Sequence, residues 1–72
     1  MSISKHFGAT VRITRKTLNI TQEELADTAG INRSHMGQIE RGKKNANIET
    51  IARIAKALHC SAGQLLDYTE SD

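Results

Sequence analysis

The sequence contains a single cysteine, no proline and only two aromatic residues, Phe7 and Tyr68. One cysteine excludes an intramolecular disulfide framework and suits a cytoplasmic protein. No apolar run is long enough to cross a membrane, and residues 1–16 lack the apolar segment of a signal peptide. We therefore expect a cytoplasmic protein that spans no membrane.

The apolar residues are mainly Ile, Leu, Ala, Val and Met, and their helical spacing favours an all-α fold. A chain of 72 residues is expected to form one domain (1–72), whose core is marginal unless the helices pack well or a partner contributes. No internal repeat, low-complexity segment or linker divides the sequence.

The formal net charge of +2 hides an asymmetry, because three of the eight acidic residues lie in the last six positions. Residues 1–66 carry ten Lys and Arg against five Asp and Glu, a net charge of +5. Basic residues that neutralise phosphates release condensed counterions, so the positive charge of residues 1–66 favours nucleic-acid binding. Many small soluble proteins are equally basic, and charge alone leaves both interpretations open.

The most strongly patterned stretch reads ITQEELADTAGINRSHMGQIERG. Thr21 is placed to cap a first helix, and Glu24, three residues later, completes a capping box. Gly30 permits the left-handed turn that ends this helix, and Asn32 then caps a second one. The spacing predicts a helix-turn-helix over about residues 21–41. Its inward-facing and staple residues are expected to be Ile20, Leu25, Ala26, Ala29, Ile31, Met36 and Ile39.

A helix over about residues 5–18 is expected before this unit, with Ser4 as its cap and Asn19 at its end. Asparagine tolerates the left-handed conformation that a helix end often requires. Its predicted core face recurs at intervals of four, three and four residues and consists of Phe7, Val11, Thr14 and Leu18.

A fourth helix over about residues 48–58 is expected after the motif, capped by Asn47. It carries the longest apolar stripe of the sequence, which we interpret as the central core element. That stripe consists of Ile48, Ile51, Ile54, Ala55 and Leu58.

A short fifth helix over about residues 62–67 is expected to begin at a capping box made by Ser61 and Gln64. Cys60 and Leu65 occupy its staple positions, and residues 68–72 form an acidic tail. The sequence therefore predicts five short helices around one core.

The outer face of the second motif helix is the candidate for reading DNA bases. Arg33 can bond bidentately to guanine, and Gln38 to adenine, while Ser34 suits several bases. Gly37 removes a side chain where the helix backbone would press closest to the major groove. An isolated helix would simply be solvated on this face; inside a well-capped helix-turn-helix we predict base contacts.

Phosphate contacts are predicted at both edges of this face. Gln22 lies at the first helical position, where its amide and the free backbone N–H groups can hold a phosphate, although it is also an ordinary first-turn residue. Arg41, Lys43 and Lys44 lie beyond the groove-facing turn and are expected to bind phosphates. Asn45 can reach either a base or a phosphate.

Arg15 and Glu40 are expected to form a structural ion pair. Glu40 follows the inward-facing Ile39, and an unpaired buried charge there would be costly. Arg15 on the first helix is its plausible partner, so neither residue is assigned to DNA.

The remaining reactive side chains predict no catalytic or metal site. His6, His35 and His59 are far apart in sequence, and only Cys60 joins one of them, so no zinc site is expected. Cys60 at a staple position is interpreted as a small buried apolar residue. The sequence gives no reason to expect an enzyme or a cofactor.

The segment TQEELADTAGINRSHMGQIERGKKN resembles the signature of the Cro/lambda-repressor-like helix-turn-helix family, and the similarity extends from about residue 7 to residue 66. The resemblance implies a compact five-helix DNA-binding domain in which the residue at the Gln22 position contacts phosphate and orients a neighbouring reader. It also implies base-facing positions at Arg33, Ser34, Gly37 and Gln38, with Arg41 and Lys43 near the DNA backbone.

Four positions depart from the family pattern. Glycine is usual at the positions of Asn19 and His59, proline is common at that of Ala46, and a core leucine is usual at that of Thr14. These departures affect stability and loop shape more than function. The length resembles that of phage Cro-like repressors and of restriction–modification controller proteins.

We expect a sequence-specific transcriptional regulator, most simply a repressor, that binds double-stranded DNA. The alternative is an antitoxin or anti-regulator acting mainly through protein contacts, which would need an exposed apolar patch in place of a polar, basic helix face. One recognition helix reads few base pairs, so we expect a two-fold homodimer on a palindromic operator. Its interface is expected at the C-terminal end, through Ala62, Leu65, Leu66 and Tyr68.

Overall fold

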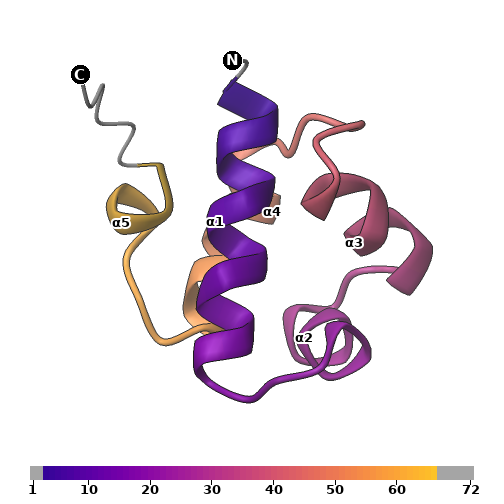
Figure 1. Cartoon of the computed structure of the whole chain (residues 1–72), viewed down its shortest axis with the longest axis vertical. Coiled ribbons are helices and arrows are strands. Elements are labelled where there is room, and N and C mark those ends of the chain that lie inside the picture. The colour runs from indigo at the N-terminus through magenta and orange to yellow at the C-terminus, as the bar shows by residue number, and fades with distance from the viewer. Residues whose placement is uncertain (1–2, 67–72) are drawn as a thin grey trace.

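The structure, a computed structural model, describes residues 3–66. Five helices and no strands lie within that range (Figure 1). They are α1 (Ile3–Thr17), α2 (Gln22–Ala29), α3 (Arg33–Glu40), α4 (Ile48–Ala57) and α5 (Ala62–Leu66). The all-α, five-helix prediction is confirmed, while the expected tail at residues 68–72 lies outside the described residues.

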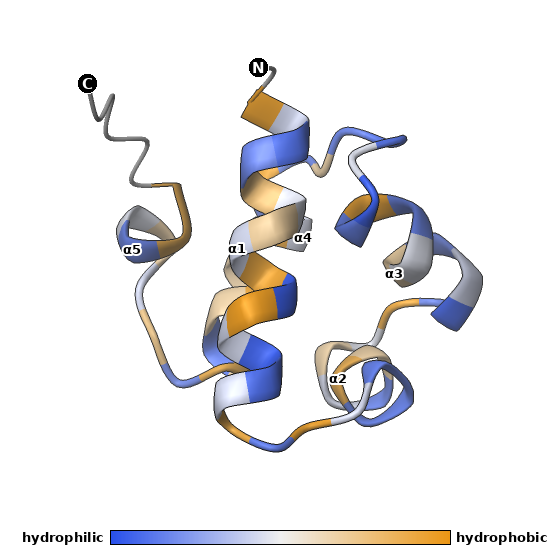
Figure 2. Ribbon diagram, in the orientation of Figure 1, coloured by the Kyte–Doolittle hydropathy of each residue, from blue (hydrophilic) through white to orange (hydrophobic). Residues whose placement is uncertain are grey.

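The longest helix, α1, runs through the middle of the molecule. It packs against α3 on one side and against α5 on the other, while α4 packs against α2 and α5 (Figure 1). In Figure 2 the helices carry both hydrophobic and hydrophilic residues, and the loop after α3 is mostly hydrophilic. The helix-turn-helix formed by α2 and α3 therefore packs against α1 and α4, through α3 and α2 respectively.

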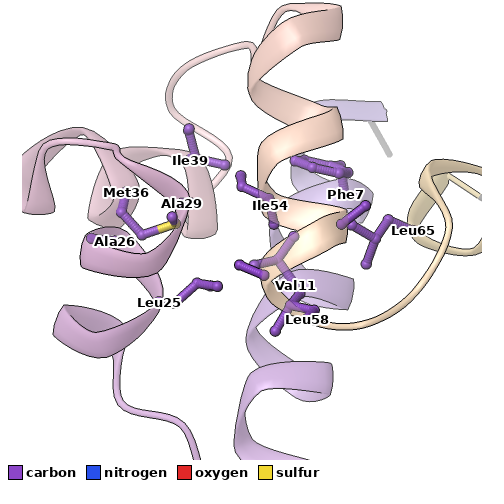
Figure 3. Close-up of a cluster of buried hydrophobic side chains, with 12 residues drawn as sticks. Phe7, Val11, Leu25, Ala26, Ala29, Met36, Ile39, Ile54, Leu58 and Leu65 are labelled. Atoms are coloured by element: carbon purple, nitrogen blue, oxygen red, sulfur yellow. The ribbon is translucent and has the colours of Figure 1, made fainter.

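The hydrophobic core joins all five helices (Figure 3). Leu25 of α2, Ile39 of α3 and Ile54 of α4 are fully enclosed, because each lies on the inward stripe of its helix. The remaining buried apolar side chains are Phe7, Val11, Ala26, Ala29, Met36, Ala55, Ala57, Leu58 and Leu65.

The predicted core faces were wrong at their ends. Leu18 is 43% exposed, because α1 ends at Thr17 and the chain turns away there. Ile48 is 85% exposed, because it is the first residue of α4 and projects beyond the core. Thr14 is only half-buried. Helical periodicity therefore identified the correct face but overestimated how far along each helix that face is covered.

Local caps set the boundaries of the helix-turn-helix as the sequence predicts. The Thr21 hydroxyl accepts from the Glu24 amide at 3.0 Å, and the Glu24 carboxylate accepts from the Thr21 amide at 2.8 Å. Gly30 ends α2 in the left-handed region with φ 69°. The Asn32 side chain accepts from the amides of Ser34 and His35 at 2.8 and 3.2 Å, so the start of α3 is held rigidly.

The caps of the later helices also agree with the sequence, but that of α1 does not. Asn47 Oδ1 accepts from the Thr50 amide at 2.8 Å, and Ser61 and Gln64 form the second reciprocal capping box. Ser4 lies inside α1, which begins at Ile3, so the prediction that it caps the helix was wrong. Its hydroxyl instead donates to the side-chain oxygen of Asn45, which ties the loop after α3 to α1.

A glycine in α1 allows an unusually close approach of α1 to α3. A Cβ on Gly8 would lie 2.3 Å from the carbonyl oxygen of Ile39 and 2.7 Å from that of Glu40. No side chain fits there, so the backbones of the two helices meet directly. This contact fixes the C-terminal end of α3 against α1.

Candidate nucleic-acid interface

A buried ion pair connects α1 to the end of α3. Arg15 and Glu40 form two parallel hydrogen bonds, Nε to Oε2 at 2.8 Å and Nη2 to Oε1 at 3.0 Å, and both residues are buried. Arg15 Nη1 also donates to the carbonyl of Ile20 at 3.0 Å, two residues before the start of α2. The predicted pair is confirmed, and it joins three segments that carry the helix-turn-helix.

The same carboxylate also orients Gln22, the first residue of α2. Gln22 Nε2 donates to Glu40 Oε1 at 3.1 Å. An ionised carboxylate only accepts hydrogen bonds, so the amide nitrogen of Gln22 must face Glu40. Its oxygen faces Gly37 of α3 and lies 3.4 Å from the position that a Cβ on that glycine would take.

Gly37 is covered, although the sequence placed it on the open outer face of α3. Besides Gln22 Oε1, Arg41 Nη1 lies 3.4 Å from the Cβ position of Gly37, and the residue is buried. The guanidinium of Arg41 folds back along α3, one turn toward its N-terminus. Gly37 therefore forms the floor of a recess between two polar side chains.

This recess, the Gly37 cavity, has a volume of about 460 Å³. Two arginines, Arg33 and Arg41, line it, and no carboxylate contributes to its wall. Its complete lining is Gln22, Asn32, Arg33, Ser34, Gly37 and Arg41. The cavity thus offers hydrogen-bond donors and positive charge on the face of α3 that the sequence assigned to DNA.

The other predicted base readers lie on α3 as expected from their spacing. Ser34 is exposed and Gln38 is half-buried. Arg33 is exposed and lies 3.7 Å from the carboxylate of Glu23 on α2. An exposed pair at this distance holds Arg33 only weakly, so its guanidinium stays available to a ligand.

The predicted phosphate residues after α3 form an exposed basic loop. Lys43, Lys44 and Asn45 are all exposed, and the Lys43 amide donates to the Gln38 carbonyl at 2.9 Å. Gly42 precedes them with φ 73°, and a Cβ there would lie 2.6 Å from the Lys5 side chain. The loop is therefore closely seated on the start of α1.

A second basic recess, which the sequence reasoning did not identify, lies on the α1 side of Gln22. This α1 cleft has a volume of about 540 Å³ and is lined by Arg12, Arg15, Lys16, Gln22, Glu40 and Arg41. Arg12 and Lys16 are exposed and stand four residues apart on one helix. That spacing was visible in the sequence, but only the fold brings the two residues beside the helix-turn-helix.

The residues predicted for a dimer interface divide into different environments. Leu65 is only 1% exposed and belongs to the core, which agrees with its predicted staple position and leaves little of its surface for a dimer interface. Leu66 is 40% exposed and Ala62 is half-buried, while Tyr68 lies outside the described residues. Leu66 shares an apolar recess with Ile3, another exposed apolar residue that the sequence reasoning missed.

No other chemical centre emerges from residues 3–66. Within this range, no three His, Cys, Asp or Glu residues are grouped closely enough to hold a metal ion. Burial raises the pKa of the half-buried Cys60 thiol, which keeps it protonated and weakly nucleophilic at neutral pH. None of the helices in this range has the length and apolarity that crossing a membrane requires.

Two capped helices joined by a tight turn, with a polar and basic outer face on the second, define a helix-turn-helix DNA-binding unit. The chain belongs to the helix-turn-helix family HTH_3, which matches residues 11–65. Together, the family and the fold make it a DNA-binding transcriptional regulator.

Similar proteins and structures agree with this assignment. The chain is 36% identical over 66 residues to control protein C.SmaI of Serratia marcescens, covering 92% of this chain and 79% of that one. The crystal structure of the restriction–modification controller protein C.AhdI from Aeromonas hydrophila matches with a TM-score of 0.82 and 35% identity, covering 88% of this chain and 94% of that chain. SinR, solved in complex with DNA, matches with a TM-score of 0.81 and 31% identity, covering 85% of this chain and 98% of that chain.

Proposed function

We propose that this chain is a sequence-specific repressor that places α3 in the major groove of double-stranded DNA. The observation that supports this most directly is that α3 is amphipathic, with one buried apolar face and one exposed polar face. Met36 and Ile39 are fully buried, whereas Arg33 and Ser34 are exposed at the end of the helix that Asn32 caps. A short helix that is anchored on one face and polar on the other can enter a groove without changing its own packing.

Base reading is assigned to the residues at and around the Gly37 cavity. Arg33 is proposed to bond guanine, Gln38 adenine, and Ser34 a base edge of either kind. Gly37 forms the floor of this cavity between Gln22 and Arg41, and because it has no side chain it leaves room there for a DNA group.

Phosphate binding is assigned to the two edges of this face. Lys43, Lys44 and Asn45 lie in the exposed loop after α3, and Gln22 begins α2. Arg41 is grouped with these residues, because its guanidinium lies beside Gln22 at the boundary of the face. Such contacts position the protein and do not select a sequence.

We further propose that the protein acts as a symmetric dimer on a palindromic operator. One α3 reads only a few base pairs, and a two-fold dimer would place two such helices about 34 Å apart, one turn of DNA. Leu66 and Ile3 share an apolar recess on one surface, and Ala62 lies in the same helix as Leu66. A second copy of the chain is the proposed occupant of this surface, with Tyr68 as a further contact.

The proposed role needs no cofactor, metal ion or catalytic residue, and it places the protein in the cytoplasm with the DNA. The relatives named as control proteins support a controller or repressor function of this kind.

Selection from a randomised duplex library, followed by gel-shift titration, tests the proposal. We expect one preferred sequence with two-fold symmetry and an affinity that falls steeply as the salt concentration rises. Binding to no duplex, or equal binding to all duplexes, would overturn the assignment of a sequence-specific regulator.

A further inference from the structure

The α1 cleft contains an excess of positive charge. Arg15 and Glu40 neutralise each other within it through their double hydrogen bond. The remaining charged residues of the lining are Arg12, Lys16 and Arg41. Among residues 3–66, none of these three forms an ion pair.

The chemistry of the lining favours one class of ligand. Three cations surround a recess of about 540 Å³, and the single carboxylate in its wall is already occupied by Arg15 and Gln22. Arg and Lys side chains bind phosphate oxygens through charge-assisted hydrogen bonds. A singly charged phosphodiester therefore complements the cleft, whereas a cation or an apolar group does not.

The position of the cleft indicates where such a phosphate comes from. Gln22 and Arg41 line both the α1 cleft and the Gly37 cavity, so the two recesses adjoin across these side chains. The lysine loop is tied instead to the opposite end of α1, where Ser4 donates to Asn45. DNA whose bases meet α3 would thus pass its backbone next to α1.

We propose that the α1 cleft binds a backbone phosphate of the DNA, with Arg12 and Lys16 as phosphate ligands beside Arg41. This inference rests on the proposed DNA-binding function and extends the footprint from the helix-turn-helix onto α1. The cleft would hold one phosphate, and Lys43 and Lys44 would hold others next to the same helix α3. The double contact fixes the angle at which α3 enters the groove.

The test compares the double variant Arg12→Gln/Lys16→Gln with the wild type on a random-sequence duplex of about 30 base pairs, by fluorescence anisotropy at several salt concentrations. Each phosphate contact contributes about 0.9 to the slope of log affinity against log salt. For two contacts we expect the slope to become shallower by about 1.8. With 1 M salt as the common reference, this change lowers the affinity of the variant at 0.1 M salt about sixtyfold relative to the wild type.

The matched control is Arg53→Gln/Lys56→Gln, which removes the same two charges from α4. Arg53 and Lys56 line a different surface recess that includes neither Gln22, Gly37 nor Arg41. We expect this control to keep the wild-type slope. All four substituted side chains are exposed, so we expect both variants to keep the fold. Circular dichroism verifies that their helices are retained.

Three results would overturn the inference. An unchanged slope in the α1 variant, with normal binding by the wild type, removes the cleft from the interface but leaves the DNA-binding function intact. Equal slope changes in both variants would show that the effect comes from the net charge and not from the α1 cleft. A wild type that binds no duplex at all removes the proposed function and this inference together.

Discussion

Gln22 Nε2 donates to Glu40 Oε1 at 3.1 Å, which ties the first residue of α2 to the last residue of α3. The carboxylate that holds Gln22 is itself held by Arg15 through two hydrogen bonds. Gln22, one of the two polar side chains that cover Gly37, is therefore oriented by the buried ion pair that joins α1 to α3. A change at this carboxylate is therefore expected to affect both the stability of the fold and the proposed DNA contact of Gln22.

Glu40→Ala is expected to destabilise the protein by about 3–5 kcal/mol, because it leaves the buried guanidinium of Arg15 without its partner. Urea denaturation followed by circular dichroism measures this loss. Glu49→Ala is the control, since the Glu49–Arg53 pair is exposed and contributes less than about 1 kcal/mol. Similar losses in the two variants would mean that the buried pair has no special role.

Gly37→Ala is expected to keep the fold but weaken DNA binding. Its Cβ would meet Arg41 and Gln22 at 3.4 Å, a contact that these side chains tolerate, and alanine favours a helix by about 1 kcal/mol over glycine. The new methyl group would occupy the floor of the Gly37 cavity, where we place the DNA. Thermal denaturation and gel-shift titration separate the two effects, and unchanged operator affinity would show that no DNA group enters the cavity.

Gly8→Ala, unlike Gly37→Ala, is expected to destabilise the fold, because its Cβ would lie 2.3 Å from the carbonyl oxygen of Ile39. Backbone must move to relieve this contact, so we expect a loss of stability of about 1–3 kcal/mol or more, as for other overpacked sites. A melting temperature equal to that of the wild type would contradict the close packing of α1 on α3.

Arg33→Ala is expected to cost about 1–3 kcal/mol on the preferred DNA site and to relax selection at one base pair. Lys44→Ala serves as the comparison, because loss of a phosphate contact weakens all sequences alike and lowers the salt slope by about one. Titration of both variants against preferred and random duplexes tests this difference. Equal weakening of both duplexes by Arg33→Ala would assign Arg33 to phosphate instead.

Leu66→Asp is expected to disrupt the proposed dimer, because it places a charge on the exposed apolar surface shared with Ile3. Sedimentation of wild type and variant, with and without operator DNA, measures the change. Leu18→Asp is a matched control on another exposed leucine, just beyond the C-terminal end of α1. A dimer unaffected by Leu66→Asp would move the interface elsewhere, and a wild type that stays monomeric on a palindromic site would exclude dimeric binding.

Features that depend on neighbours a few residues apart were predictable from the sequence. The caps at Thr21, Asn32 and Asn47 agree with the structure, because a side chain there needs only the amide two or three residues later. Asn19 adopts φ 60° as expected, and His59, where the family often has glycine, adopts φ 59°. The element order and the helix-turn-helix follow from such local rules.

Tertiary structure alone decided the features that join distant residues. The burial of Leu65, the exposure of Ile48 and the cover over Gly37 depend on where other helices end, and periodicity within one helix contains no such information. The α1 cleft likewise unites residues from three helices. Arg15 and Glu40 are the exception among long-range contacts, because the cost of burying an unpaired charge restricts which partners are possible.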